Sequence, residues 1–403
     1  MVSVECVRQQ QKERLLSRSS VSMRSAFVDF VREVFGGRQR IPLHAPLFGE
    51  LEEQSVVEAI RSSYVSSVGA MVGEFEQEIV RYTGAKFAIA TNTGTAALHV
   101  GLSAVGVEED DEVITQSLTF VATCNAIRYC GASPVFVDID SDSLSLSPLR
   151  LEEFLHDNSE IRDDGCCWNV RTDRRIRACV PMHNLGHPAR TAQIRNICSK
   201  FNVHVVEDAA ESLGSCEGDR HTGRVGVLGV LSFNGNKIIT TGGGGAVITD
   251  NESVAESVRH LTTTAKKEHP WLFLHDRVGF NYRMPNLNAA LGCAQIKRLE
   301  QHLLKKRELA SAYADWFAGH AEPFFAERPT TRANYWLNAI LLPDRVSRDD
   351  FLGYTNDRGI MTRPMWTPMH TLPMFADAES GHLDNTERIE SRLVCIPSSV
   401  PEL

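Results

Sequence analysis

The chain has 403 residues, of which 42% are hydrophobic and 23% are charged, and its formal net charge at pH 7 is −9. This composition is typical of a folded globular protein with a large hydrophobic core. Nucleic acids and membrane surfaces attract basic faces, whereas this chain has a net negative charge, and no apolar stretch is long enough to cross a bilayer. We therefore expect neither a nucleic acid nor a membrane as a partner.

The amino-terminal part, residues 1–40, is mostly polar. Its start is too polar for a secretory signal sequence, and ten cysteines occur along the chain without a Cys-x-x-Cys pair. We therefore expect free thiols and a cytoplasmic location. Residues Ala26 to Phe35 have amphipathic spacing, which predicts one helix in an N-terminal extension. Whether the native chain starts at Met1 or at Met23 stays open.

From Ile41 onward, strand and helix patterns alternate over about two hundred residues. Helical spacing occurs at residues 94–105, 119–130 and 192–201, and apolar β-type runs occur at residues 87–90, 112–114, 134–139, 178–182, 203–207, 230–233 and 246–249. Such alternation predicts a mostly parallel sheet with helices on both faces, in a large domain over residues 41–265. The ligand of such a sheet lies beyond the carboxyl ends of its strands.

The pattern changes in residues 266–403, which are expected to form a smaller C-terminal α+β domain. One long helix is predicted over residues 288–317, one strand over 335–342 and one further helix over 348–358. The polar stretch 157–175 has little periodicity and is expected to be a surface insertion.

Residues 230–250 contain one lysine, Lys237, between two apolar runs, followed by the four glycines of residues 242–245. Glycines let a flat ligand approach the backbone closely. Taken alone, a loop lysine is more often a solvated charge, and a glycine run more often a flexible turn. The stretch matches neither the phosphate-loop motif nor the dinucleotide-binding motif.

Several polar residues follow the expected strands directly, so they should meet at one edge of the sheet. Gly94 and Thr95 lie between a strand and a helix, where free amides favour an anion. Asp208 follows another strand, and Ser232 and Lys237 belong to the central stretch. Each has an ordinary explanation on its own, as a helix cap or a strand-end hydroxyl.

Together, an amine, a carboxylate and an anion cradle suit pyridoxal phosphate. Its aldehyde condenses with a lysine, its pyridine nitrogen needs a carboxylate, and its phosphate needs amides and hydroxyls. Phe120 begins a predicted helix and could cover one face of the ring, although core packing is the simpler explanation for one phenylalanine.

His183 and His187 are four residues apart, the spacing of metal ligands on a helix. Gly186 lies between them and a strand precedes them, which disfavours a helix, and no third ligand is evident. We therefore expect no metal site and place both histidines near the substrate pocket.

Most of the chain, from about Ile41 to Ser399, resembles the DegT/StrS-type sugar aminotransferases. The similar segments, in chain order, are TGTAALH (93–99), DEVITQSLTFVATCNAI (111–127), GASPVFVDID (131–140), EDAAESLGS (207–215), LSFNGNKIITTGGGG (231–245) and NYRMPNLNAALG (281–292). The resemblance implies the aspartate-aminotransferase-like fold type I of pyridoxal-phosphate enzymes. This fold has a mostly parallel seven-stranded central sheet with helices on both faces.

The resemblance also implies a role for individual residues. Lys237 would bind the cofactor covalently, and Asp208 would pair with the pyridine nitrogen. Asn281 would reach the cofactor phosphate of a second subunit, which implies a homodimer. The remaining implied cofactor contacts are the ring-stacking Phe120, the phosphate ligands Gly94, Thr95 and Ser232, and Glu211 close to the ring.

Four glycines at 242–245 depart from the Thr-Gly-Glu-Gly-Gly sequence of many members. With the segments 181–188, 260–271, 334–342 and 363–370, they resemble the branch that acts on 4-keto-6-deoxy-N-acetylhexosamine nucleotides for legionaminic-acid-type sugars. This branch implies transfer of an amino group from L-glutamate to C4 of a UDP- or GDP-linked 4-ketosugar. The product would serve cell-surface polysaccharide or nonulosonic-acid biosynthesis. The expected substrate contacts are His183, His187, Asn334, Trp336 and His370.

Three alternatives stay open. A pyridoxal-phosphate-dependent sugar dehydratase would carry histidine at the lysine position, so Lys237 disfavours it. A ligand-binding regulator on this fold would carry a winged-helix domain, for which the residues before Ile41 are too few. A non-catalytic protein with a structural role is disfavoured by the intact Lys237 and Asp208. The choice between UDP and GDP and the stereochemistry of the sugar also stay open.

Overall fold

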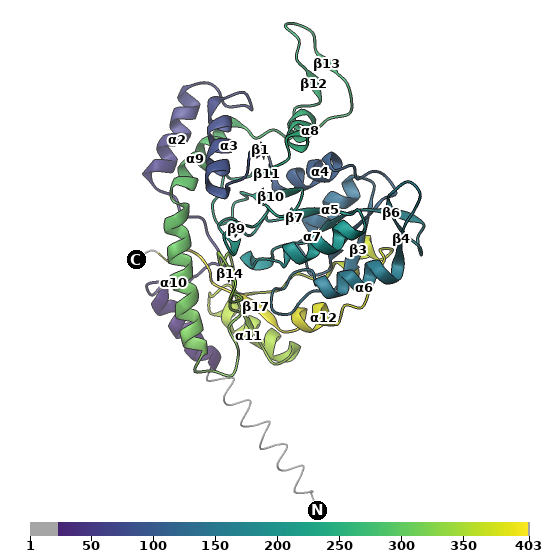
Figure 1. The fold of residues 1–403 in the computed structure, drawn as a ribbon. Helices are drawn as coiled ribbons and strands as arrows, with labels where there is room; N and C mark the ends of the chain where they lie inside the picture. The colour runs from purple at the N-terminus through teal and green to yellow at the C-terminus, as the bar shows by residue number, and fades with distance from the viewer. Residues whose placement is uncertain (1–22, 402–403) are drawn as a thin grey trace, which may run out of the picture.

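The computed structural model describes residues 23–401 of the chain. Residues 1–22 lie outside this range. The choice between Met1 and Met23 as the first residue concerns these residues. Figure 1 shows a central sheet enclosed by helices, with the long α10 along one side. None of the described helices has the length and hydropathy required to span a membrane.

The central sheet is mostly parallel, in the strand order β1-β11-β10-β7-β6-β2-β3. Only β11 runs antiparallel to its neighbours in this path, β1 and β10. The α/β class expected from the sequence is thus confirmed. The strands are β1 (Phe87–Thr91), β2 (Glu112–Gln116), β3 (Ser133–Val137), β6 (Arg174–Val180), β7 (His204–Asp208), β10 (Leu228–Ser232) and β11 (Gly245–Thr249).

Stretch 157–175 is more than a surface insertion. Its strands β4 (Ser159–Ile161) and β5 (Cys167–Asn169) pair antiparallel, and β5 joins β6, so the whole sheet has nine strands. The sequence did not indicate these short strands, because an edge hairpin can have one face in water and therefore contain many polar residues.

Helices cover both faces of the sheet because its strands are apolar on both sides (Figure 1). Val206 points to one face and the neighbouring Val205 to the other. The first face carries α4 (Gly94–Ala104), α5 (Val121–Tyr129) and α8 (Glu252–Thr262). The second carries α3 (Ala70–Thr83), α6 (Pro148–Asn158), α7 (Thr191–Lys200) and α9 (Asn286–Lys297), with α2 (Glu50–Arg61) packed against α9.

The carboxyl-terminal part contains a small antiparallel sheet in the order β15-β17-β16. The chain is helical over residues 23–34, and Phe27 of this helix packs in one cluster with Tyr313, Ile340 and Phe351. The domain boundaries at residues 41 and 265 stay predictions. The elements are α10 (Leu299–Phe317), β15 (Asn338–Leu341), α11 (Arg345–Asp357), β16 (Arg363–Pro364), α12 (Asp384–Glu390) and β17 (Leu393–Ile396).

Two expected elements of this part were wrong in detail. The helix expected over 288–317 is two helices, α9 and α10, which meet at Arg298 because its backbone (φ −100°, ψ −2°) leaves the helical path. The strand expected from Tyr335 begins only at Asn338, because Tyr335 has a φ of +48°, which no strand accommodates.

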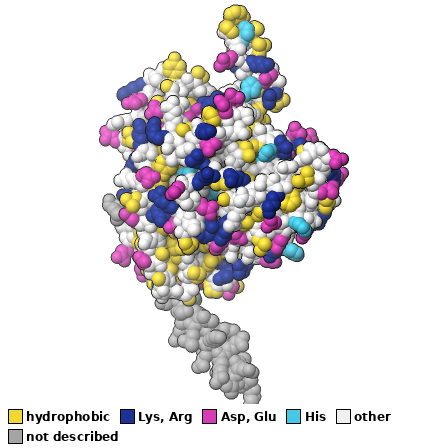
Figure 2. All heavy atoms as spheres, viewed as in Figure 1, with side chains coloured by type: hydrophobic (Ala, Val, Ile, Leu, Met, Phe, Trp, Pro, Cys, Tyr) yellow, Lys and Arg dark blue, Asp and Glu magenta, His cyan; other side chains and the backbone are white. Residues whose placement is uncertain are grey.

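A hairpin of β12 (Lys266–Lys267) and β13 (Leu274–His275) projects from the body in Figure 1. Figure 2 shows hydrophobic side chains gathered at its tip. The remaining short elements are β8 (Cys216–Glu217), β9 (Arg220–His221), β14 (Thr331–Arg332) and the 3₁₀ turns η1 (Asn184–Gly186), η2 (Met369–Thr371) and η3 (Pro373–Phe375).

Candidate active site

A cavity of about 210 Å³ lies at the carboxyl ends of β7 and β10, beside the first turn of α4. Its position beyond the strand ends is the one expected for a ligand of a parallel sheet. Thr93, Ala122, Met182, Ala210 and Asn234 contribute to its wall. Six residues expected from the sequence to hold the cofactor also line it: Gly94, Thr95, Phe120, Asp208, Ser232 and Lys237.

One end of the cavity is built to hold an anion. Thr93 caps α4 by accepting the Ala96 amide, and Gly94 and Thr95 form the first turn, where amides have no acceptor within the helix. Ser232 ends the adjacent β10. A Cβ atom on Gly94 would lie 2.9 Å from the Ser232 Cβ, so only glycine allows this close approach.

The other end holds a buried carboxylate. Asp208 is only 2% exposed; its Oδ2 accepts the Thr123 hydroxyl at 2.6 Å and its Oδ1 accepts the Ala210 amide at 3.1 Å. Burial raises the pKa of Asp208 above its ordinary value, against these hydrogen bonds and the positive charge of Lys237. Within residues 23–401 no cation forms an ion pair with this carboxylate, so it suits a ligand that carries an N–H⁺ group.

Lys237 supplies an amine to the same cavity wall. It lies in the turn between β10 and β11, and its Nζ donates to Glu211 Oε1 at 3.2 Å and lies 4.1 Å from the centre of the Trp336 ring. Glu211 Oε2 accepts the Leu185 amide at 2.9 Å. Burial raises the pKa of Glu211 to about 7, although the charge of Lys237 opposes the shift. Near neutral pH this carboxyl group is therefore partly protonated.

Phe120 provides an aromatic wall. It is the N-cap of α5 and is 45% exposed, while its ring lies 6.0 Å from that of Trp366 in an edge-on arrangement. A phenylalanine that packs the core is not exposed to this extent, so core packing does not explain Phe120. An exposed aromatic ring beside a cavity suits a planar ligand.

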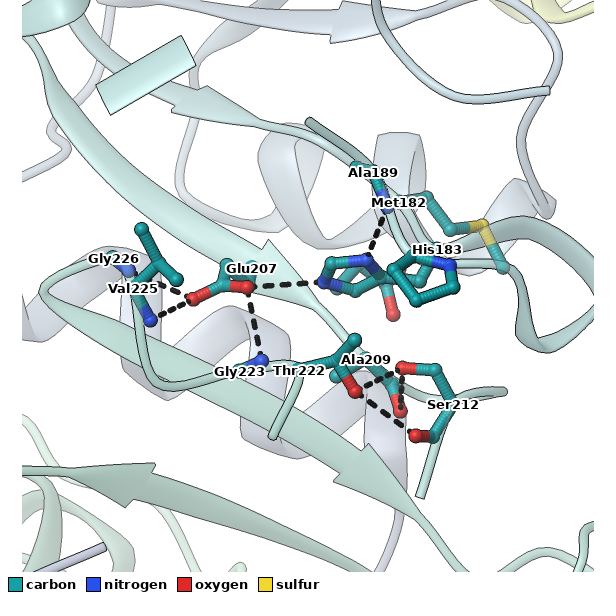
Figure 3. A network of polar contacts seen from close by, with 12 residues as sticks. Met182, His183, Ala189, Glu207, Ala209, Ser212, Thr222, Gly223, Val225 and Gly226 are labelled. Atoms are coloured by element: carbon teal, nitrogen blue, oxygen red, sulfur yellow. Dashed lines mark hydrogen bonds and ion pairs between the residues drawn. The ribbon is translucent and has the colours of Figure 1, made fainter. Parts of the chain in front are cut away.

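Glu207 precedes Asp208 on β7 and points to the other face of the sheet. Figure 3 shows it accepting four hydrogen bonds, from the amides of Gly223, Val225 and Gly226 and from Nε2 of His183. Burial by itself raises the pKa of Glu207, but these donors outweigh it and the pKa lies below its ordinary value. Glu207 thus holds the polypeptide that leads into β10.

His183 has no free ring nitrogen for a substrate. Its Nδ1 accepts the Ala189 amide at 2.9 Å, so Nε2 carries the proton that is donated to Glu207 at 3.1 Å (Figure 3). His187 is 3% exposed, with its ring edge-on to Phe325 and Tyr335. Burial lowers the pKa of His187 to about 4.

The other three expected substrate contacts also lie outside the cavity wall. The Asn334 amide donates to the carbonyls of Glu211 and Leu213 at 2.8 and 2.9 Å, and His370 Nδ1 lies 2.7 Å from the Ser117 hydroxyl. Trp336 is buried against Lys237. A substrate role for these residues stays a prediction. Asn281 is exposed, pairs through its backbone with Thr263 and does not line the cavity of its own chain.

Sequence reasoning missed the contacts that Thr123 and Trp336 make to Asp208 and Lys237. Thr123 had a usable signal, since it lies three residues after Phe120 in the first turn of the same helix. Trp336 had none, because no local pattern links it to a lysine that lies in another part of the chain.

The model of the DegT/DnrJ/EryC1/StrS aminotransferase family matches residues 46–402. The chain belongs to this family. A relative in Bacillus subtilis (strain 168), EpsN, provisionally named a pyridoxal phosphate-dependent aminotransferase, is 34% identical over 366 residues, covering 89% of this chain and 91% of EpsN. The GDP-perosamine synthase of Escherichia coli O157:H7 is 32% identical over 342 residues, covering 85% of this chain and 89% of that enzyme.

Among solved structures, the aminotransferase TlmJ from Streptoalloteichus hindustanus superposes with a TM-score of 0.80 at 25% identity, covering 89% of this chain and 93% of TlmJ. This DegT-family protein is therefore a pyridoxal-phosphate-dependent sugar aminotransferase. The residues of its cavity fit the cofactor: free amides and a hydroxyl at Gly94 and Ser232, a buried carboxylate at Asp208 without an ion pair among residues 23–401, and the amine of Lys237 in the same wall.

Proposed function

We propose that this aminotransferase transfers an amino group from L-glutamate to C4 of a UDP- or GDP-linked 4-keto-6-deoxy-N-acetylhexosamine. The reaction takes place in the cytoplasm and serves cell-surface polysaccharide or nonulosonic-acid biosynthesis, of the legionaminic-acid type. The relative named GDP-perosamine synthase supports a nucleotide-linked amino sugar. The free thiols of every cysteine in residues 23–401 suit a reducing compartment.

The observation that carries this proposal is the meeting of Lys237, Asp208 and the Gly94–Ser232 cradle in one cavity. When bound, pyridoxal phosphate supplies an electron sink that acidifies a proton beside an attached amine. Lys237 would hold the cofactor, and its Nζ would move that proton. Asp208 would hold the ring nitrogen, and Glu211 orients Nζ through their 3.2 Å hydrogen bond.

A homodimer is part of the proposal. Trp271 and Phe273 on the β12–β13 hairpin are 77% and 80% exposed, and exposed apolar side chains that gather in this way are typical of protein contacts. Asn281 is exposed near the same hairpin, so it is available to the cofactor of a second copy. Light scattering should give twice the chain mass, and Asn281→Ala should weaken retention of the cofactor.

The first half-reaction tests the proposed chemistry. Purified protein with pyridoxal phosphate should show a visible absorption band, and added L-glutamate should convert the cofactor to its amino form and release 2-oxoglutarate. A nucleotide 4-ketosugar should then restore the band, giving the alternating kinetics of a two-step transfer. Assays across UDP- and GDP-linked 4-ketosugars identify the acceptor.

The alternatives give different results in the same assay. A sugar dehydratase would consume the 4-ketosugar without a need for glutamate, and a binding protein would leave glutamate unchanged. If Lys237→Ala kept both the visible band and the activity, the role proposed for Lys237 would be wrong.

A further inference from the structure

Lys306 is a fully buried lysine that no step of the proposed reaction uses. It lies on α10, and its Nζ donates to the carbonyl of Trp336 at 3.1 Å and to the carbonyl of Ser398. Among residues 23–401 no carboxylate forms an ion pair with it. Burial lowers the pKa of Lys306 to about 7. A buried amine without an acidic partner is costly, so its two carbonyl contacts call for a structural reason.

The carbonyl of Trp336 belongs to a segment with an unusual backbone. Tyr335 has a φ of +48°, and the Trp336 amide donates to Asn334 Oδ1 at 2.7 Å. Lys306 therefore fixes one side of Trp336 while Asn334 fixes the other. A non-glycine residue with positive φ persists only where surrounding contacts hold it.

Trp336 in turn touches Lys237 in two ways. Its indole Nε1 donates to the carbonyl of Asn236, the residue before Lys237, at 2.6 Å, and its ring faces Lys237 Nζ at 4.1 Å. The hydrogen bond fixes the backbone of the lysine, and the ring fixes the amine. An aromatic face also favours the charged form of an amine that lies over it.

We propose that Lys306 is a positioning residue for Lys237, and that it acts through Trp336. The chain of contacts runs from Lys306 Nζ to the Trp336 carbonyl, from the indole to the Asn236 carbonyl, and from the ring to Lys237 Nζ. This chain of contacts connects Lys306 on α10 to the Lys237 amine in the turn between β10 and β11. The inference rests on the role proposed above for Lys237.

The charged and titratable groups around the Lys237 amine include Glu211, Asp208 and His44. Burial, with the charges of Lys306 and Lys237, holds the pKa of His44 well below its ordinary value. Glu211 accepts a hydrogen bond from the Lys237 amine, and the Trp336 ring lies over the same amine. Displacement of the ring therefore changes the position of the amine, which a rate measurement can detect.

The test measures how fast apo-protein and pyridoxal phosphate form the visible absorption band. Trp336→Leu removes the ring and the indole N–H and should slow band formation about tenfold. Trp336→Phe keeps an aromatic face without the indole N–H and should give an intermediate rate.

Lys306→Met removes the anchor of the Trp336 carbonyl. Loss of the anchor displaces the ring, so we expect slower band formation. In the Trp336→Leu background, where no ring remains to be displaced, Lys306→Met should produce no further slowing. If Lys306→Met does not fold, Lys306→Gln, a neutral polar side chain, is read in the same way.

Unchanged band formation in Lys306→Met, or equal slowing with and without Trp336, would overturn the inference. Lys237→Ala keeps the two proposals distinguishable. If the wild type forms no band, or if Lys237→Ala forms it as well, the role of Lys237 fails. If only Lys237→Ala lacks the band and Lys306→Met does not slow its formation through Trp336, the positioning role alone fails.

Discussion

Replacement of Glu211 by glutamine should change the pH dependence of stability in the apo-protein. The unfolding free energy of Glu211→Gln should rise relative to that of the wild type as the pH increases. Glu211 is 2% exposed, and burial raises its pKa from an ordinary value of 4.5 to about 7. Between these values the folded chain binds more protons at Glu211 than the unfolded chain does. The contribution of Glu211 to stability is therefore retained below about pH 4.5 and lost as the pH rises toward 7.

The size of the effect follows from the two pKa values. They differ by about 2.5, and each pH unit is worth about 1.4 kcal/mol, so the full cost is roughly 3 kcal/mol above both values. Linkage gives less than about 1 kcal/mol at pH 5 and about 3 kcal/mol at pH 8. Glu211→Gln removes this cost, so its stability relative to the wild type should improve by roughly 2.5 kcal/mol across that range.

Equilibrium urea unfolding of both apo-proteins at several pH values from 5 to 8 measures this difference. The new amide side chain also alters the contacts with Leu185 and Lys237, but the resulting offset should vary little with pH in this range. Glu109→Gln is the matched control, because it removes the same formal charge from an exposed position. Parallel pH profiles for wild type and Glu211→Gln would refute the reasoning.

Three further changes address the other parts of the site. Asp208→Asn should nearly abolish transamination, which the glutamate half-reaction measures. It should not lower the stability of the apo-protein at pH 8, because it removes a carboxylate whose pKa burial raises, and urea unfolding measures this effect. Gly94→Ala should weaken cofactor binding at least tenfold in a spectroscopic titration, because its Cβ would crowd Ser232, whereas Gly73→Ala, with open space around its Cβ, should not. Glu207→Gln should cost about 2–4 kcal/mol of unfolding free energy, since an amide has only one oxygen for four donors.

The grouping of the cofactor residues could be predicted from the sequence because strand positions and strand ends have strong local signals. Apolar runs locate the strands, and the rule that ligands bind at their carboxyl ends brings Gly94, Asp208 and Lys237 together. The cavity contains all three. Continuous helical spacing could not reveal the break at Arg298, since both sides of the break satisfy the same period.

The surroundings of Lys237 could not be predicted, because they depend on packing between distant segments. The sequence made His183, Asn334 and Trp336 candidates for substrate contacts. The structure gives their polar groups to Glu207, to the backbone of residues 211–213 and to Asn236. A polar residue in a motif can serve the backbone that presents the site, and sequence spacing does not distinguish that role from contact with a ligand.

The two acidic residues that end β7 illustrate how one strand supports both stability and chemistry. Alternation places Glu207 and Asp208 on opposite faces. Glu207 accepts four hydrogen bonds and has a lowered pKa, so its charge is fully compensated within the protein. Asp208 accepts two and has a raised pKa, so part of its charge remains uncompensated. A cationic ring nitrogen would supply the missing compensation, so cofactor binding would stabilise the folded protein at Asp208.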